Sequence, residues 1–300
     1  MDKDNIAKFD TAISDKPLKR KSQAYEIWRR LCKNKGAIVG LVIFALLVFA
    51  ALSSVFIFDY ETDVIRINVP NSFHPPSLEY PFGTDELGRN ILARVAYGAR
   101  VSLSIGFTVT FFAILIGITL GSIAGYYGGK LENVIMRIMD VFLAIPAMLL
   151  AICIVAALGA STTNMMIALV ISAVPGYSRV MRAPVLAVRD IEYVEAARAI
   201  GARNSTIIIR HVLPNCLAPM IVQTAIGVAV AILNVAALSF LGLGVQPPTP
   251  EWGSMLAASR DFIRDYSYMA FFPGAAIMLT ILSLNLLGDG LRDALDPRLK

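Results

Sequence analysis

Only two of the 300 residues are histidines, and the spacing of the other residue types that take part in catalysis shows no catalytic arrangement. The two histidines, His74 and His211, fall in different loops, and no serine–histidine or paired-carboxylate arrangement accompanies either one. A phosphate-binding loop of the pattern G-x-x-x-x-G-K-[ST] is also missing, because the nearest match, Gly128-Gly129-Lys130, continues to Leu131. The sequence therefore predicts a protein that is not an enzyme and that does not hydrolyse ATP itself.

Metal binding has equally little support among the residue types. The three cysteines form no C-x-x-C pair and no cluster with histidine; they are Cys32, Cys153 and Cys216. Asp85 and Glu86 are neighbouring carboxylates without further ligands close by, and Asp85 is expected to cap the start of a helix instead. The sequence predicts no metal site and no cofactor.

The clearest pattern of residue spacing is found in the charged stretch 179–210, which holds six arginines and three acidic residues. Small and apolar residues recur there at helical intervals, on a stripe made of Ile191, Val194, Ala197 and Gly201. Glu195 stands directly before Ala196 and Ala197, so an acidic anchor lies beside small residues that let another backbone come close. This chemistry suits contact with a partner better than catalysis.

Two residues are expected to shape this stretch. Gly201 interrupts the helix and lets the chain turn, and Pro214, which follows Leu213, ends a second short segment over 203–212. The stretch is then either a juxtamembrane helix lying on lipid headgroups or a docking surface for another protein. Geometry by itself leaves both alternatives open.

The elements that must position this stretch are long runs without any charged residue or histidine. These runs cover 36–58, 101–129, 141–178, 212–250 and 266–288. A helix needs about 20 apolar residues to cross a bilayer, so the runs are long enough to span one. Turn residues at 159–164 and 242–250 split the longer runs, which predicts six spans: 36–58, 101–127, 133–158, 164–182, 216–241 and 267–288.

The sequence therefore predicts an all-α membrane protein with six transmembrane helices and excludes a soluble enzyme, a disordered chain and a disulfide-stapled secreted module. The predicted parts are a tail over 1–35, the first span over 36–58, an extracytoplasmic loop with an amphipathic helix over 59–100, a helical core over 101–288 and a tail over 289–300.

Charge sets the expected orientation. Lys and Arg outnumber Asp and Glu on the side that holds both termini and the loop 183–214, whereas acidic residues prevail on the other side. By the positive-inside rule, both termini and that loop are cytoplasmic. The net charge of +5 is then a signal of topology, and no nucleic-acid partner is expected.

Several motifs resemble one family of transport proteins. The order Glu195-Ala196-Ala197-x-x-x-Gly201, continued by Leu213-Pro214 between the fourth and fifth predicted spans, resembles the EAA loop of permease subunits of ABC importers. His211 stands where that family has an apolar residue, so this position is not carried over. Longer segments are similar to the C-type permease subunit of dipeptide, oligopeptide and nickel importers, and they cover 82–106, 240–256 and 285–300.

The resemblance implies a type I ABC importer permease fold with a cytoplasmic coupling loop. The residues expected to contact an ATPase are Glu195, Ala196, Ala197, Gly201, Leu213 and Pro214. It implies a second homologous permease, two cytoplasmic ABC ATPases and an extracytoplasmic solute-binding protein as partners, in the plasma membrane of a bacterium or an archaeon. Di- and oligopeptides are the expected substrates, with nickel or another small solute as the alternative and an ATP-independent secondary transporter as the less favoured one.

Two amide side chains fall inside the predicted span 216–241. Gln223 and Asn234 are eleven residues apart, about three helical turns, so they share one face of the helix. An amide inside a membrane faces either protein or a water-filled path. The pair therefore indicates either a lining for the backbone groups of a transported peptide or hydrogen bonds between helices.

Three local patterns carry further structural expectations. Small residues at four-residue steps predict close helix packing in the second span; they are Gly117, Gly121 and Gly125. Arg137 and Asp140 are spaced to pair across one helical turn. Trp252 is expected to anchor the outer membrane interface.

Overall fold

The computed structural model describes residues 23–295, and all of the regular secondary structure in this range is helical. The helices are α2 (Gln23–Leu31), α3 (Lys35–Ile57), α4 (Ile91–Tyr127), α5 (Gly129–Leu143), α6 (Ala147–Leu158), α7 (Thr162–Val188), α8 (Glu192–Ala199), α9 (Asn204–Ile207), α10 (Leu213–Phe240), α11 (Trp252–Ser259) and α12 (Tyr268–Leu295). Short turns of other helix types cover Tyr60–Ile65, Val69–Asn71, Ile208–Val212 and Arg260–Phe262. The terminal parts of the predicted tails, 1–22 and 296–300, lie outside the described residues.

Five helical stretches within the described range are long and apolar enough to cross a membrane: α3, α4, α7, α9 together with α10, and α12. The pair α5 and α6 would make a sixth span, but its two helices are bent by 85° at the break between them. The predicted span over 133–158 thus consists of two helices with a sharp bend between them. Pro146 explains the break, because proline has no N–H to donate and disfavours helical geometry in Ile145 before it.

Close packing of α4 against α7 forms the centre of the molecule. A Cβ on Gly117 or Gly121 would collide with α7, and one on Gly125 would lie 2.8 Å from Val185 Cγ1. These three glycines thus let the two backbones approach each other, as their four-residue spacing predicts.

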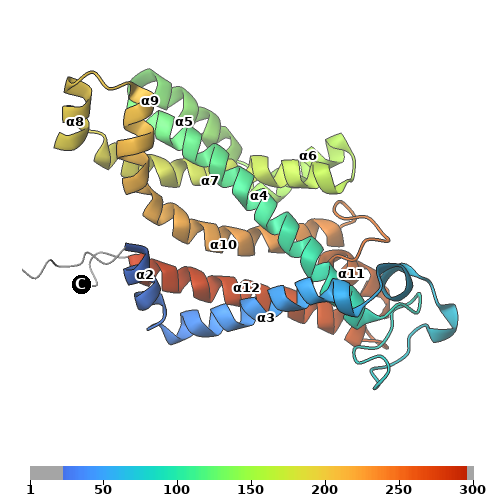
Figure 1. Cartoon of the computed structure of the whole chain (residues 1–300). Coiled ribbons are helices and arrows are strands. Elements are labelled where there is room, and N and C mark those ends of the chain that lie inside the picture. The colour runs from blue at the N-terminus through green and yellow to red at the C-terminus, as the bar shows by residue number, and fades with distance from the viewer. Residues whose placement is uncertain (1–22, 296–300) are drawn as a thin grey trace, which may run out of the picture.

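The first and last long helices pack side by side (Figure 1). Gly40 of α3 lies against α12, where an added Cβ would sit 2.7 Å from the carbonyl oxygen of Ser283. Figure 1 also shows α8 and α9 at one end of the molecule, and the 58–90 loop with α11 at the other. The two regions singled out by the sequence, 179–210 and 240–256, are therefore far apart.

A cluster of polar contacts holds the loop before α4 in one conformation. Asp85 does not cap a helix, because Asn90 is the N-cap of α4 and accepts from the backbone N–H groups of Leu92 and Ala93. Asp85 instead accepts a 2.7 Å hydrogen bond from the side chain of Arg89. The expectation fails because Asp85 lies one turn too early, before the loop closes.

Buried charged side chains stabilise this polar cluster. Arg94 lies 3.5 Å from Asp85 and donates to the carbonyl oxygen of Val64 at 2.7 Å. Burial, together with the neighbouring charge of Asp85, raises the pKa of the Glu86 carboxyl. A buried carboxylate stays bound to its cations because either partner left alone would carry an uncompensated charge.

The start of α11 is locked to α4 by one buried carboxylate. Glu251, only 1% exposed, accepts hydrogen bonds from the N–H groups of Gly253 and Ser254 at 2.9 Å each and from the hydroxyl of Ser102 at 3.1 Å. Burial raises the pKa of the Glu251 carboxyl. Because this carboxylate serves two helices, it sets the position of the 240–256 segment.

Trp252 beside it is not an interface anchor. Its side chain is 0% exposed, and its indole N–H donates to the carbonyl oxygen of Val95 at 3.0 Å. Gly98 provides the space on α4, with its added Cβ 3.2 Å from the indole. The expectation of an exposed anchor is wrong because tertiary packing closes over this aromatic ring.

Replacing Glu251 with alanine should lower the stability of the folded chain. The change removes a helix cap and leaves Ser102 with no carboxylate to donate to, which together cost about 2 kcal/mol. Thermal unfolding of the purified chain in detergent measures the loss. Glu79→Ala, an exposed carboxylate in the outer loop, is the control and should leave the transition in place. Equal transitions for both variants would contradict the role given to Glu251.

Candidate functional site

The short helix α8 carries most of the predicted coupling residues and has two different faces. Val194 and Ala197 are buried in a cluster with Tyr126, Ile207 and Val212. These two residues therefore attach α8 to the rest of the chain. The small size of Ala197 serves this internal packing, in contrast to its predicted role in admitting a partner's backbone.

The opposite face of α8 is open. Glu195 and Ala196 are exposed, and Ile200 at the end of the helix is 84% exposed. A large apolar side chain left uncovered beside a carboxylate is typical of a contact surface. Of the predicted residues, Leu213 is half-buried and Pro214 exposed, both in the first turn of α10, beyond α9.

Gly201 closes α8 with a left-handed turn. Its φ is +81°, its N–H donates to the carbonyl oxygen of Arg198 at 3.0 Å, and the N–H of Ala202 donates to that of Ala197 at 3.1 Å. This pair of bonds is a Schellman motif, which satisfies the carbonyl groups at the end of a helix. No atom lies within 4 Å of an added Cβ, so the backbone conformation, and no neighbour in the chain, requires glycine here.

The return from α8 to the core runs without a break. The stretch from Asn204 to Phe240 is continuously helical through a π-helical turn at Ile208–Val212. The prediction that Pro214 ends the segment is therefore wrong. Proline is tolerated in the first turn of a helix, and the wider π turn before it leaves room for a residue without an N–H.

Side-chain contacts tie the α8 region to the ends of two core helices. The hydroxyl of Tyr126, at the end of α4, donates to Asn204 Oδ1 at 3.1 Å, and the guanidinium of Arg198 lies 5.8 Å from the centre of the Tyr126 ring. On the other side, the Asn215 amide of α10 donates to the hydroxyl of Tyr193 at 3.2 Å. Sequence analysis missed Tyr126, because it ends an apolar run and has no local polar pattern.

Arginines on α7 hold α5 in place. Arg179 lies 2.6 Å from Asp140, and Arg182 binds Glu132 through two nitrogens. The predicted pair of Arg137 with Asp140 does not form. Asp140 turns to the neighbouring helix because the close packing of α5 on α7 brings Arg179 within reach.

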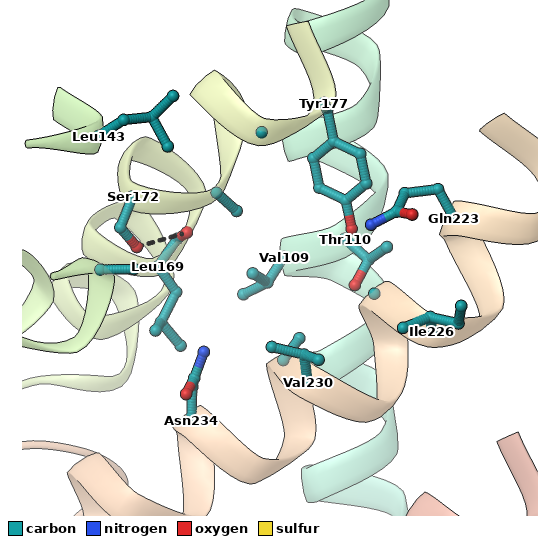
Figure 2. A pocket seen from close by; sticks show the side chains of 15 residues that line it. Val109, Thr110, Leu143, Leu169, Ser172, Tyr177, Gln223, Ile226, Val230 and Asn234 are labelled. Atoms are coloured by element: carbon teal, nitrogen blue, oxygen red, sulfur yellow. Dashed lines mark hydrogen bonds between the residues drawn. The ribbon is translucent and has the colours of Figure 1, made fainter. Parts of the chain in front are cut away.

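A cavity of about 240 Å³ lies between the core helices. It is lined by α4, α7 and α10 with the break between α5 and α6, and every lining residue is uncharged. Figure 2 shows the side chains that point into it, among them Thr110, Ser172, Tyr177, Gln223 and Asn234.

The two amides predicted to share a face both line this cavity. Figure 2 shows Gln223 and Asn234, both on α10, at opposite ends of it. Neither side chain makes a hydrogen bond to another residue within 23–295. Their donors and acceptors are therefore free to bind a molecule in the cavity, which favours the lining over the alternative of helix–helix hydrogen bonds.

Tyr177 is a cavity residue that sequence analysis did not identify. Its hydroxyl lies against Gly227, where an added Cβ would collide with it. A glycine four residues after Gln223 is the signal that could have pointed to this contact. Together, Tyr177 and Gly227 narrow the space between α7 and α10.

No group of three or more His, Cys, Asp or Glu side chains between residues 23 and 295 could hold a metal ion. The arrangement can bind a neutral, hydrogen-bonding molecule in the cavity and a protein on the open face of α8.

Two protein families match the chain. The family described as "Binding-protein-dependent transport system inner membrane component" matches residues 117–300, and the family "N-terminal TM domain of oligopeptide transport permease C" matches residues 22–76.

Close relatives cover nearly the whole chain. The dipeptide transport system permease protein DppC of Alkalihalophilus pseudofirmus is 48% identical over 92% of this chain and 90% of its own length. The di/tripeptide transport system permease protein DppC of Pseudomonas aeruginosa is 44% identical over 98% of both chains. The glutathione transport system permease protein GsiD of Escherichia coli is 42% identical over 96% of both.

The fold also matches a solved structure. A chain of the MetNI methionine ABC transporter in an inward facing conformation aligns with a TM-score of 0.54 and 20% sequence identity. The alignment covers 68% of this chain and 96% of that one. The two chains therefore share a fold.

Replacing Gly227 with alanine should destabilise the packing around the cavity, because the new methyl group collides with the Tyr177 hydroxyl. We expect a loss of about 1–3 kcal/mol, the usual range for overpacking. The double variant Tyr177→Phe/Gly227→Ala should recover part of it, since the hydroxyl is gone. Thermal unfolding of the single and double variants checks this, and strictly additive effects would show that the two residues do not touch.

Proposed function

The chain belongs to the family of binding-protein-dependent transport system inner membrane components, and we propose that it is the permease subunit of an ATP-driven importer of di- and oligopeptides. One observation carries this proposal: the chain is similar to the dipeptide and di/tripeptide permeases over nearly its full length and over nearly the full length of each relative. The family membership confirms the resemblance seen in the sequence.

Membership of the family supports the following assembly. A second homologous permease completes the path, two cytoplasmic ABC ATPases supply energy, and an extracytoplasmic solute-binding protein delivers the substrate. The chain then crosses the inner membrane of a bacterium, or the plasma membrane of an archaeon, six times with both termini in the cytoplasm. The α5–α6 pair provides the broken span, and the basic excess around 179–210 supports the cytoplasmic side for α8.

The coupling step rests on the two faces of α8. Its exposed face, with Glu195, Ala196 and Ile200, enters a cleft of the ATPase, while its buried face stays attached to the permease. When ATP binding closes the ATPases, α8 moves with them. The contact of Tyr126 with Asn204 and the continuous helix into α10 pass this movement to the spans that line the cavity.

The cavity suits peptides because of what lines it. Gln223 and Asn234 each offer a donor and an acceptor, which is what the N–H and C=O groups of a peptide backbone require. Because the lining is uncharged, it does not select peptides by the charge of their side chains. A nickel ion would need His, Cys or carboxylate ligands, and the cavity lining contains none of them.

Glu195→Arg and Gly201→Val should leave the chain inserted in the membrane but uncouple peptide uptake from ATP hydrolysis. The first change reverses the charge on the exposed face, and the second disfavours the left-handed turn that ends α8. The measurement is uptake and ATPase activity of the full importer in proteoliposomes.

Gly159→Val is the matched control for the second variant. Gly159 also has positive φ, +92°, with nothing within 4 Å of an added Cβ, but it lies in the turn between α6 and α7. Uptake at the unaltered rate in Gly201→Val, or an equal loss in Gly159→Val, would contradict the coupling role of α8. Uptake driven by an ion gradient without ATP would contradict the importer itself.

Gln223→Leu and Asn234→Leu should each slow peptide uptake while the ATPase remains coupled. Each change removes hydrogen bonds worth about 0.5–1.5 kcal/mol, so uptake efficiency should fall roughly 2- to 10-fold. The control is Thr119→Val, which removes an exposed hydroxyl from the outer face of α4, away from the cavity. Initial uptake rates over a range of dipeptide concentrations check this. Unchanged rates in both leucine variants would remove these amides from the path.

A further inference from the structure

The first described helix, α2, has an apolar face, and other parts of the chain pack against only half of this face. Successive residues of a helix are about 100° apart, so Ile27 and Leu31 lie together, and Trp28 and Cys32 continue the same face. Ile27 and Leu31 pack against the end of α12 in a small cluster with Ala37, Leu291 and Ala294. The second half of the face has no such cover.

That second half is exposed and aromatic. Trp28 is 53% exposed, Tyr25 one turn before it is exposed as well, and Cys32 one turn after it is an exposed free thiol. The N–H of Cys32 donates to the carbonyl oxygen of Trp28 at 2.9 Å, so Cys32 still follows the helical turn. An uncovered tryptophan of this kind is typical of helices that lie in a membrane interface.

Basic residues flank the apolar face. Arg29 and Arg30 lie in the last turn of α2, and Lys33 and Lys35 follow before the first span. Glu26 is the one acidic residue within α2. Basic side chains that cluster beside an apolar stripe are suited to bind the phosphate groups of anionic lipids.

The position of α2 places this surface at the membrane boundary. The apolar helix α3 begins at Lys35, and its N-cap, Asn34, also donates to Asp293 of α12 at 2.9 Å. Figure 1 shows α2 lying across the ends of α3 and α12, where these helices would leave the membrane. Only three residues connect α2 to α3, so α2 stays close to the place where α3 enters the membrane.

We propose that α2 is a binding site for anionic phospholipids. The side chains of Trp28 and Cys32 enter the boundary of the acyl chains, and Arg29, Arg30, Lys33 and Lys35 bind the headgroup phosphates. The proposal requires that α3 crosses the membrane, and it holds for any transported solute. It commits to lipid over a protein partner because apolar face, basic flank and membrane level coincide on one helix.

Tryptophan fluorescence tests the proposal directly, because the chain has only two tryptophans. Trp252 is 0% exposed, and the importer that carries Trp28→Phe measures, in each lipid, the background from Trp252 and from the tryptophans of the partner subunits, which is subtracted. The full importer is reconstituted in vesicles of mixed phosphatidylglycerol and phosphatidylcholine, with bromine on the acyl chains of one lipid at a time. We expect brominated phosphatidylglycerol to quench the Trp28 signal at least twofold more than brominated phosphatidylcholine at equal mole fraction.

The charge variants identify the source of this preference. Arg29→Gln/Arg30→Gln/Lys33→Gln should abolish the preference for phosphatidylglycerol, while Arg260→Gln/Arg264→Gln, exposed arginines far from α2, should keep it. Equal quenching by the two brominated lipids would overturn the proposal. So would a Trp28 signal quenched by neither lipid: quenching by acrylamide in the aqueous phase would then show that α2 faces water, and no quenching by acrylamide would show that a partner protein covers it. Uptake of peptide is measured on the same vesicles, so failure of the importer is seen separately.

Discussion

The close approach of α4 and α7 is the contact on which the other features depend. Three glycines of α4, with Gly121 in the middle, bring the two backbones together, so that α7 residues such as Ser178 lie against its main chain. Without side chains between them, the helices gain packing contacts along their whole length, which is the main source of helix association inside a membrane. The same contact directs Tyr177 into the cavity and the arginines of α7 toward α5.

Helix α4 also connects the two regions to which we assign a function, the α8 region and the cavity. At one end of α4, Tyr126 binds Asn204 and supports α8; farther along, Thr110 lines the cavity, and at the far end Ser102 binds Glu251. In the proposed coupling step, a displacement of α8 reaches the cavity through α4 and α10, the helices that α8 contacts and continues into.

Expectations that rest on helical periodicity agree with the structure, whereas several that assigned a local role to one side chain do not. The glycine steps of α4 and the shared face of Gln223 and Asn234 follow from helical periodicity, which the spacing of residues contains. Asp140 and Trp252 were misjudged because their partners, Arg179 and Val95, come from other helices. Local spacing predicts the nearest candidate partner, whereas packing selects the one that the fold brings within reach.

The sequence by itself determined the all-helical membrane class, the order of the apolar runs, the glycine that ends α8 and the family resemblance. These follow from the length of apolar runs, from charge and from local conformational preference, which need no knowledge of neighbours. Only the tertiary structure decided which face of α8 is free, that Ala197 is buried and that Tyr177 narrows the cavity. These depend on contacts between residues far apart in the chain, and such contacts exist only once the helices have packed.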